Sequence, residues 1–249
     1  MPKGNFKEWL VSVMRRRQIP IEKKRVQEYI HIYKRTSQLV PQMVDFVETI
    51  FDRRKKGKLY GQLVFLGRGS RPFYRIAYRL AGAHRVPIES IKLVEAGRRL
   101  SGKIYEKPKM RKQLLKYLQG QGININKPIS FIDTGVIGTV PNDFVQLFRL
   151  ENLSVKVNGY MFYGRNVRFD KIGQYSPSPK INWTLPHLSE REARAILEDL
   201  PKSTTTVKEL VESKKKVSPK YSMEEPEEII GSLVVKRAIM DSLRALGKT

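Results

Sequence analysis

The sequence predicts an α/β fold with a mostly parallel sheet, on two observations. Continuous apolar runs at Leu63–Leu66 and Ile129–Ile132 have the pattern of strands that are buried on both faces. Each run ends abruptly in glycine and polar residues, and a helical pattern then begins. Strand, helix, strand and helix in this order imply parallel strands joined by right-handed crossovers. We therefore expect a Rossmann-like sheet covered by helices, with helical extensions at both ends of the chain.

The residue pattern divides the chain into three segments. Residues 1–57 are expected to form a basic helical N-terminal segment, in which one helix begins at Pro41. Residues 58–185 carry the alternation of strands and helices. Residues 186–249 are expected to form a helical C-terminal extension, with an amphipathic helix at Leu188–Leu200 and a further helix near the chain end.

Glycine, proline and polar residues mark the expected elements of the middle segment. A helix is expected to open near Ser70, a short strand to cover Ile91–Val94 and a second helix to run over Pro108–Leu118. A helix with aromatic residues on one side follows the second glycine loop. The sequence further predicts a β-hairpin over residues 153–163, because the Asn158-Gly159 pair is the strongest short turn signal.

The composition is that of a folded chain without cysteine. At 249 residues, with 40% hydrophobic and 9% aromatic residues, the chain is long enough and apolar enough to bury a core. The absence of cysteine excludes disulfides, thiolate zinc sites and cysteine nucleophiles. The three histidines are far apart in the sequence and lack the spacing of metal ligands.

The amino-terminal sequence does not have the order of a secretory signal peptide. The apolar patch Phe6–Met14 precedes the cations Arg15–Arg17, whereas a signal peptide has its charge first. No segment approaches the roughly 20 apolar residues that a membrane span needs. We therefore expect a cytoplasmic protein without a membrane partner.

The chain is strongly basic. It has 48 lysines and arginines against 24 acidic residues, which gives a formal net charge of +24 and an isoelectric point near 10.2. Such a charge attracts polyanions. Because the cations cluster, nucleic-acid binding by the basic helices is one functional hypothesis, and solvated helix faces are the alternative. The residues expected to contact phosphates are Arg15, Arg16, Arg17, Arg53, Arg54, Lys55 and Lys56.

The first candidate site is the loop after the strand at 63–66. Its residues are Gly67, Arg68, Gly69, Ser70 and Arg71. Glycines permit a positive φ or a close backbone approach, and backbone amides with two arginines can bind a phosphate or another anion. The alternative is a tight strand-to-helix turn that needs glycine only for packing.

The second candidate site is the loop after the strand at 129–132. Its residues are Asp133, Thr134, Gly135, Gly138 and Thr139. The carboxylate of Asp133 can bind ribose hydroxyls or hold Mg²⁺, and the threonine hydroxyls can donate to phosphate oxygens. The alternative is that Asp133 or Thr139 caps the following helix.

Together the two loops resemble the type I phosphoribosyltransferase superfamily over roughly residues 60–150. In that family an Arg-Gly-Gly loop binds pyrophosphate, and a later strand with acidic residues and a Thr/Gly loop binds the ribose phosphate. Arg68-Gly69-Ser70 matches the first loop, and Asp133, Gly138 and Thr139 match parts of the second. The resemblance implies a phosphorylated ribose or nucleotide ligand, Mg²⁺ as cofactor and Asp133 as the catalytic residue.

The chain departs from that family at a position that matters for catalysis. Thr134 stands where the family has its second acidic residue, and the loop from Asp133 to Thr139 is shorter than the family's motif. Ligand binding with slow or absent turnover is therefore expected. Two other hypotheses stay open, namely a non-enzymatic DNA- or RNA-binding protein and a phosphohydrolase-like α/β enzyme with Asp133 as nucleophile.

Overall fold

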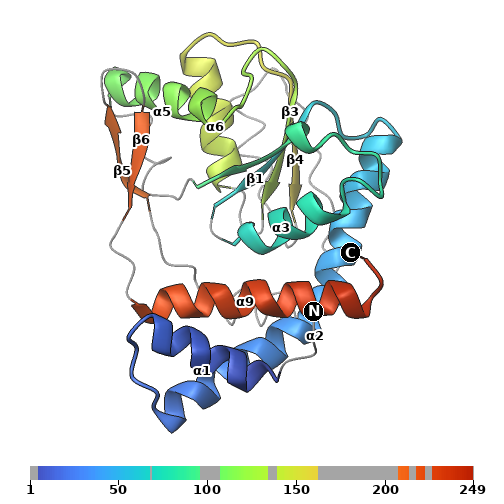
Figure 1. Cartoon of the computed structure of the whole chain (residues 1–249). Coiled ribbons are helices and arrows are strands. Elements are labelled where there is room, and N and C mark those ends of the chain that lie inside the picture. Colours follow the sequence, from blue (N-terminus) through green and yellow to red (C-terminus); the bar gives the residue numbers. More distant parts are fainter. Residues whose placement is uncertain are drawn as a thin grey trace.

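The computed structural model describes residues 5–67, 69–95, 107–133, 139–161, 207–212, 217–221 and 226–248, and its fold is drawn in Figure 1. Its α-helices are α1 (Phe6–Arg16), α2 (Lys23–Lys55), α3 (Arg71–Leu80), α5 (Pro108–Gly120), α6 (Thr139–Leu150) and α9 (Pro226–Ala245). A short 3-10 helix, η1, covers Ile88–Ser90. The strands are β1 (Gln62–Leu66), β2 (Ile91–Val94), β3 (Ile129–Asp133), β4 (Val157–Met161), β5 (Val207–Glu212) and β6 (Val217–Tyr221).

Four of these strands form one parallel sheet in the order β2-β1-β3-β4. Leu63 pairs with Ile91 on one side of β1, and Gln62 pairs with Ile129 on the other side. Every residue of β1 and of β3 is buried, as expected from their continuous apolar sequence. The predicted α/β fold with a parallel sheet is therefore confirmed.

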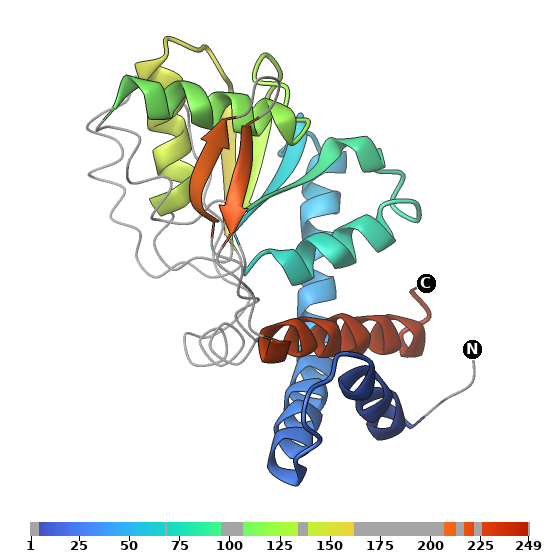
Figure 2. The ribbon, with the colours of Figure 1, turned by 60° about the vertical axis from the view of Figure 1, so that its left-hand side comes forward.

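Helices cover both faces of this sheet (Figures 1 and 2). On one face, α2, α3 and α9 share a core in which the Phe46 ring lies 5.5 Å from Phe73 and 5.3 Å from Tyr160, between ring centroids. On the other face, α5 and α6 pack on the strands, and Phe131 of β3 stacks on Phe144 at 5.4 Å. Burial of apolar surface in these two cores stabilises the three-layer arrangement.

A smaller helical cluster joins the two ends of the chain. It is formed by α1, the start of α2 and α9. The Tyr33 hydroxyl donates to Asp241 Oδ2 at 3.0 Å, and Arg237 Nε donates to the same oxygen at 2.6 Å. Arg237 also lies over the ring of Trp9, 5.5 Å from its centroid. Helical extensions are thus present at both ends, and none of the described helices is both long and apolar enough to cross a membrane.

The predicted hairpin over residues 153–163 is wrong. A single strand, β4, contains Asn158 and Gly159 and pairs in parallel with β3. The buried Asn158 side chain accepts from the Tyr60 hydroxyl at 3.0 Å and donates to the Lys58 carbonyl at 3.2 Å. Because these hydrogen bonds satisfy the amide inside the fold, the Asn-Gly pair can lie within a strand instead of forming a turn.

The prediction that a helix begins at Pro41 is also wrong. α2 runs through Pro41 without a break, although proline leaves the carbonyl of Ser37 without its helical donor. Such a residue costs roughly 3 kcal/mol in a helix interior. On either side of it Val40 and Met43 are completely buried in the core against the sheet, and this packing outweighs the local cost.

The C-terminal extension contains strands as well as a helix. β5 and β6 form an antiparallel hairpin, in which Val207 pairs with Tyr221, and the hairpin lies beside α5 (Figures 1 and 2). Val207, Val211 and Val217 favour strands because their side chains are branched at Cβ. The charged residues between them obscure this signal in the sequence. The predicted helix at Leu188–Leu200 lies outside the described residues.

Gly57 and Gly61 provide a matched test of how the chain enters β1. Both have a positive φ, +68° and +69°, but only at Gly61 would an added Cβ overlap backbone, at the carbonyl of Pro128. Gly57→Ala should lower the free energy of unfolding by about 1–2 kcal/mol, the cost of the left-handed conformation. Gly61→Ala should cost roughly 1–3 kcal/mol more, since the two chain segments must separate. Urea unfolding measures both, and equal losses would contradict the close approach.

Candidate functional site

The carboxyl ends of β1 and β3 lie side by side at one edge of the sheet. β2 pairs on one side of β1 and β3 on the other, so the order of the chain across the sheet reverses between these neighbours. In open α/β sheets, ligands bind at such a point, outside the carboxyl ends of the strands. Phe65 pairs with Ile132, which puts Gly67 and Asp133 at adjacent strand ends. The two predicted loops therefore begin next to each other.

The first loop is tied to both strands that flank β1. Gly67 has a positive φ of +72°, which glycine adopts without steric cost, and its N–H donates to the Val94 carbonyl of β2 at 2.8 Å. Ser70 is fully buried, and its hydroxyl donates to the Ile132 carbonyl of β3 at 3.4 Å. The loop is thus held over the end of β1 from both sides.

The amino end of α3 opens at this edge of the sheet. The helix begins at Arg71, with Pro72 in its first turn. Ser70 precedes it but makes no capping hydrogen bond, and its hydroxyl bonds to β3 instead. The first N–H groups of a helix carry partial positive charge and can donate to an anion, although Pro72 itself has no N–H. Gly69 lies in the same turn, whereas Arg68 lies outside the described residues.

Asp133 ends β3 at the same edge, with 8% of its surface exposed. A carboxylate buried to this extent is costly unless polar groups or cations accompany it. Of the other predicted residues in this loop, Thr139 is the first residue of α6, and Thr134, Gly135 and Gly138 lie outside the described residues. The second loop therefore contributes Asp133 to the site that the structure describes.

Two arginines bring positive charge to the first two turns of α3. Arg71 is ion-paired with Glu95, the residue that follows β2. Arg75 is partly buried, and its side chain has neither an ion pair nor a hydrogen bond among the described residues. Burial and the nearby charge of Arg71 lower the pKa of Arg75, although an arginine remains protonated at neutral pH. Arg71 is thus paired with a carboxylate, whereas the guanidinium of Arg75 has no ion pair among the described residues.

Arg75 is a functional candidate that the sequence analysis did not include. Its spacing of four from Arg71 puts both residues on one face of the helix that follows the loop. That spacing was a usable signal. The burial of Arg75 and the pairing of Arg71 with Glu95 depend on the fold, because Glu95 follows β2 and is distant from Arg71 in the sequence.

The residues at this edge fit a metal ion only if a ligand completes its coordination. No group of three or more acidic or histidine side chains that could hold a metal occurs among the described residues. Asp133 provides one carboxylate, and Glu95 is engaged by Arg71. Mg²⁺ commonly binds through one or two carboxylates together with the phosphates of a substrate. Asp133 therefore fits a Mg²⁺ that is shared with a phosphorylated ligand.

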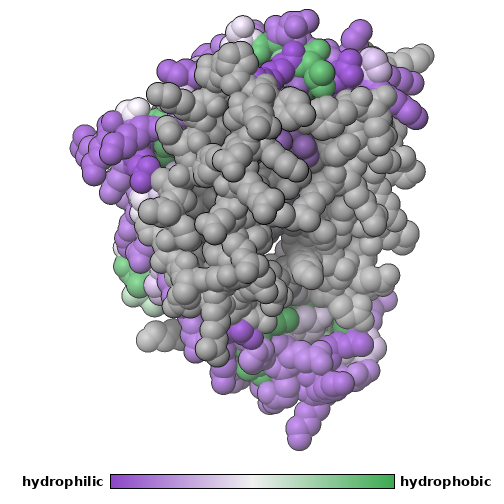
Figure 3. Space-filling model, turned by 180° about the vertical axis from the view of Figure 1, so that it is seen from behind, coloured by the Kyte–Doolittle hydropathy of each residue, from purple (hydrophilic) through white to green (hydrophobic). Residues whose placement is uncertain are grey.

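The basic run Arg15–Arg17 lies exposed at the end of α1, far along the chain from the sheet edge. Lys23 and Lys24, at the start of α2, are exposed too, and none of these five side chains is ion-paired within the described part of the chain. Ile21 between the two helices is 44% exposed. Seen from behind, the end of the molecule where these helices lie is covered mainly by hydrophilic residues (Figure 3). We call Arg15–Arg17 with Lys23 and Lys24 the basic corner.

The second basic run is used differently. The Arg53 guanidinium lies over the ring of Tyr160, 5.1 Å from its centroid, and Arg54 donates to the Gly61 carbonyl. Burial lowers the pKa of Arg54. Lys55 and Lys56 are exposed. Of the residues predicted to contact nucleic acid, Arg53 and Arg54 thus have protein partners, and the basic corner holds the larger set of exposed cations.

Comparison with models of known protein families gives no match for this chain, and comparison with curated proteins gives none either. A fold of this class hosts many unrelated functions. Function therefore has to be inferred from the residues at the sheet edge and from the exposed cations.

Proposed function

We propose that this protein binds a phosphorylated ribose or nucleotide at the carboxyl edge of its parallel sheet. The observation that carries the proposal is the reversal of chain order between β1 and β3, flanked by the glycine loop and by Asp133. Backbone N–H groups at the start of α3 and the charge of Arg75 would bind the phosphate. Asp133, on the neighbouring strand, would accept hydrogen bonds from the ribose hydroxyls.

The resemblance to type I phosphoribosyltransferases extends this proposal to a reaction. The ligand would be phosphoribosyl pyrophosphate, with its pyrophosphate at Gly67–Arg71 and its ribose at Asp133. A Mg²⁺ held by Asp133 and the ligand's phosphates would offset the charge of the leaving pyrophosphate. Asp133 would also stabilise the positive charge that develops on the ribose. Because Thr134 replaces the family's second carboxylate, binding is proposed as the main activity, with slow or absent turnover.

Titration with phosphoribosyl pyrophosphate and Mg²⁺, and with simple nucleotides, tests the binding proposal. Arg75→Ala removes a charged partner of the phosphate, and Asp133→Asn removes the anionic acceptor for ribose or metal. Hydrogen bonds to charged groups are worth roughly 1.5–3 kcal/mol, so each change should weaken binding about 10- to 150-fold. Isothermal calorimetry measures the affinities. Release of pyrophosphate, with water or an added nucleobase as the acceptor of the phosphoribosyl group, measures turnover.

The matched control for Arg75→Ala is Arg79→Ala. It removes the same charge from the next turn of α3, where the side chain is exposed. Arg79→Ala should leave affinity nearly unchanged, and all three variants should unfold at denaturant concentrations near that of the wild type. Absence of binding to either ligand class, or equal affinities in wild type and variants, would rule out this site.

A second candidate function is nucleic-acid binding at the basic corner. The observation in its favour is that five exposed cations, three of them consecutive arginines, lie together without acidic partners among the described residues. Arginine and lysine bind the phosphates of DNA or RNA and release condensed counterions as they do so. The net charge of +24 would strengthen the long-range attraction.

Salt dependence distinguishes this function from a surface that is simply charged. The logarithm of the affinity for a DNA or RNA oligonucleotide should fall linearly with the logarithm of the salt concentration, with a slope of about −0.7 to −0.9 per phosphate contacted. Replacement of Arg15, Arg16 and Arg17 by alanine should make that slope less negative by about 2–3. The control replaces three exposed cations elsewhere by alanine, namely Arg79, Lys109 and Lys127. Equal effects of the two triple variants would contradict a specific role for the corner.

A further inference from the structure

β2 is one of the two edge strands of the parallel sheet, and part of its backbone has no hydrogen-bond partner among the described residues. It pairs with β1 on one side only. Since the Val94 carbonyl accepts from Gly67, alternate residues of β2 face β1, and Ile91, Leu93 and Glu95 turn their backbone groups outward. The Ile91 N–H is used within η1, where it donates to the Ile88 carbonyl. Four outward-facing backbone groups thus have no hydrogen-bond partner among the described residues. They are the Ile91 carbonyl, the N–H and carbonyl of Leu93, and the Glu95 N–H.

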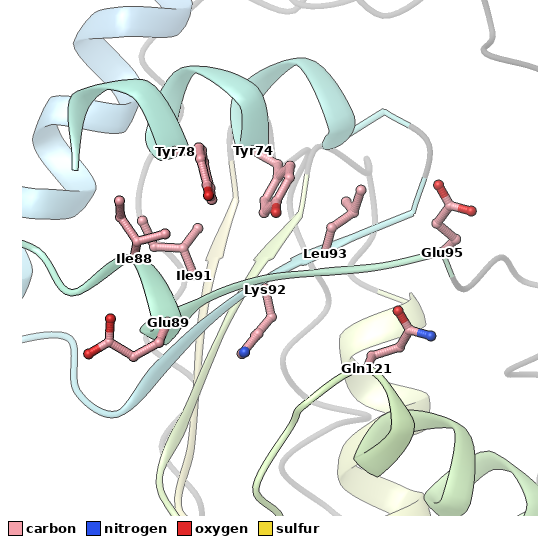
Figure 4. Close-up of a pocket in the computed structure, with 9 residues that line it drawn as sticks. All are labelled: Tyr74, Tyr78, Ile88, Glu89, Ile91, Lys92, Leu93, Glu95 and Gln121. Atoms are coloured by element: carbon pink, nitrogen blue, oxygen red, sulfur yellow. The ribbon is translucent and has the colours of Figure 1, made fainter. Parts of the chain in front are cut away.

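A groove runs along this edge (Figure 4). Its volume is about 540 Å³, and it follows β2 from the 3-10 turn η1 before the strand to the residue after it. The tyrosines of α3 overhang one side, and a lysine and a glutamine line the other. The lining residues are Tyr74, Tyr78, Ile88, Glu89, Ile91, Lys92, Leu93, Glu95 and Gln121.

The side of the groove toward α3 is aromatic and apolar. The Tyr74 and Tyr78 rings lie 6.1 Å apart between centroids, and Tyr78 is 46% exposed. Ile88, at the other end of this side, is 43% exposed. Burial, with the neighbouring Tyr78, raises the pKa of Tyr74 above its ordinary value. Large rings held in this way offer contact area for apolar side chains.

The side toward α5 is polar and positively charged. Lys92 alternates with its neighbours in β2 and so lies on the opposite face of the strand from Leu93. Its Nζ lies near Gly122, and Gln121 lines the groove on the same side. No carboxylate pairs with Lys92 in the described part of the chain. Two acidic residues line the groove as well. Glu95, at its carboxyl end, is ion-paired with Arg71, and Glu89 lies in η1, before the amino end of β2.

We propose that an extended segment of a partner protein adds to β2 as a further strand of the sheet. Its backbone pairs with Leu93, with the Ile91 carbonyl and with the Glu95 N–H. Successive side chains of a strand point to opposite faces. One set therefore packs on Tyr74 and Tyr78, and the alternate set faces Lys92. The partner segment is one in which apolar residues alternate with acidic residues, and strand addition of this kind is a common mode of peptide recognition.

A second copy of this chain fits the edge less well than such a segment. If two β2 strands paired antiparallel about a twofold axis, their outward residues would pair with each other, Leu93 with Leu93 or Ile91 with Leu93. Either register brings Lys92 opposite or diagonal to its own copy on one face of the sheet. Like charges in those positions destabilise the pairing. A separate segment with a carboxylate at that place has complementary charge.

A pair of fluorescent peptides tests the proposal on the full chain. One is an end-blocked octapeptide of alternating aspartate and valine, and the other has lysine in place of aspartate. The wild type should bind the aspartate peptide with a Kd below about 1 mM, as measured by anisotropy. Lys92→Glu should weaken that binding at least about tenfold and strengthen binding of the lysine peptide, because the new carboxylate repels aspartate and attracts lysine.

Two controls separate strand addition from general attraction to a basic protein. Lys127→Glu makes the same charge change at an exposed site elsewhere and should leave both affinities nearly unchanged. An aspartate peptide that is N-methylated at two adjacent central residues, one valine and one aspartate, keeps its side chains but loses one backbone donor toward β2 whichever way the added strand runs, because alternate residues face β2. It should bind at least about tenfold more weakly. Amide exchange at Leu93 and Glu95 should slow when the aspartate peptide binds.

Four results would overturn the proposal. They are no binding of the aspartate peptide at 1 mM, equal effects of Lys92→Glu and Lys127→Glu, equal binding of the N-methylated peptide, and unchanged exchange at Leu93 and Glu95. Dimers in sedimentation experiments that are abolished by Leu93→Pro but not by the peptide would assign the edge to a second copy instead.

Discussion

The burial of β1 determines where everything else in this protein lies. This strand is covered on both faces and paired on both edges, by β2 and by β3. Parallel strands need crossovers. The crossover from β1 to β2 and the crossover from β2 to β3 run in opposite directions across the sheet, so right-handed connections place α3 and α5 on opposite faces. The same geometry brings the carboxyl ends of β1 and β3 together. The loops at Gly67 and Asp133 are therefore neighbours because of topology, although they are far apart in sequence.

The amino ends and the carboxyl ends of the parallel strands differ in how their polar groups are satisfied. At the amino edge the groups bond to one another, since Ser130 Oγ donates to the Tyr60 carbonyl at 2.9 Å and Gln62 exchanges two hydrogen bonds with the backbone of Asn124. At the carboxyl edge the first turn of α3 has no side-chain cap, and Arg75 lacks an acidic partner in the described structure. A charged ligand gains more from donors that are not already engaged. The guanidinium of Arg75 is such a donor at the proposed ligand site.

The apolar pattern of the sequence predicted the helices and strands that are buried in the cores. The prediction failed where a polar side chain is hydrogen-bonded by residues far away in the sequence. Strands at 63–66 and 129–132 follow from continuous hydrophobicity, which depends on the residues themselves. Asn158 belongs to a strand because Tyr60 and Lys58 bond to its side chain, and no local signal carries those partners. The site divides in the same way. Its loops were predictable from glycine and charge, while the pairing of Arg71 and the burial of Arg75 required the fold.

The net charge of +24 combines cations with different roles. Arg53, Arg54 and Arg71 contact an aromatic ring, a carbonyl and a carboxylate, so they contribute to the structure of the protein itself. The basic corner belongs to the helical cluster of α1, α2 and α9, whereas Arg75 belongs to a helix that packs directly on the sheet. Each site rests on its own set of contacts. Loss of charge at one of them should therefore leave the geometry of the other intact, so substitutions can test the two proposed binding functions separately.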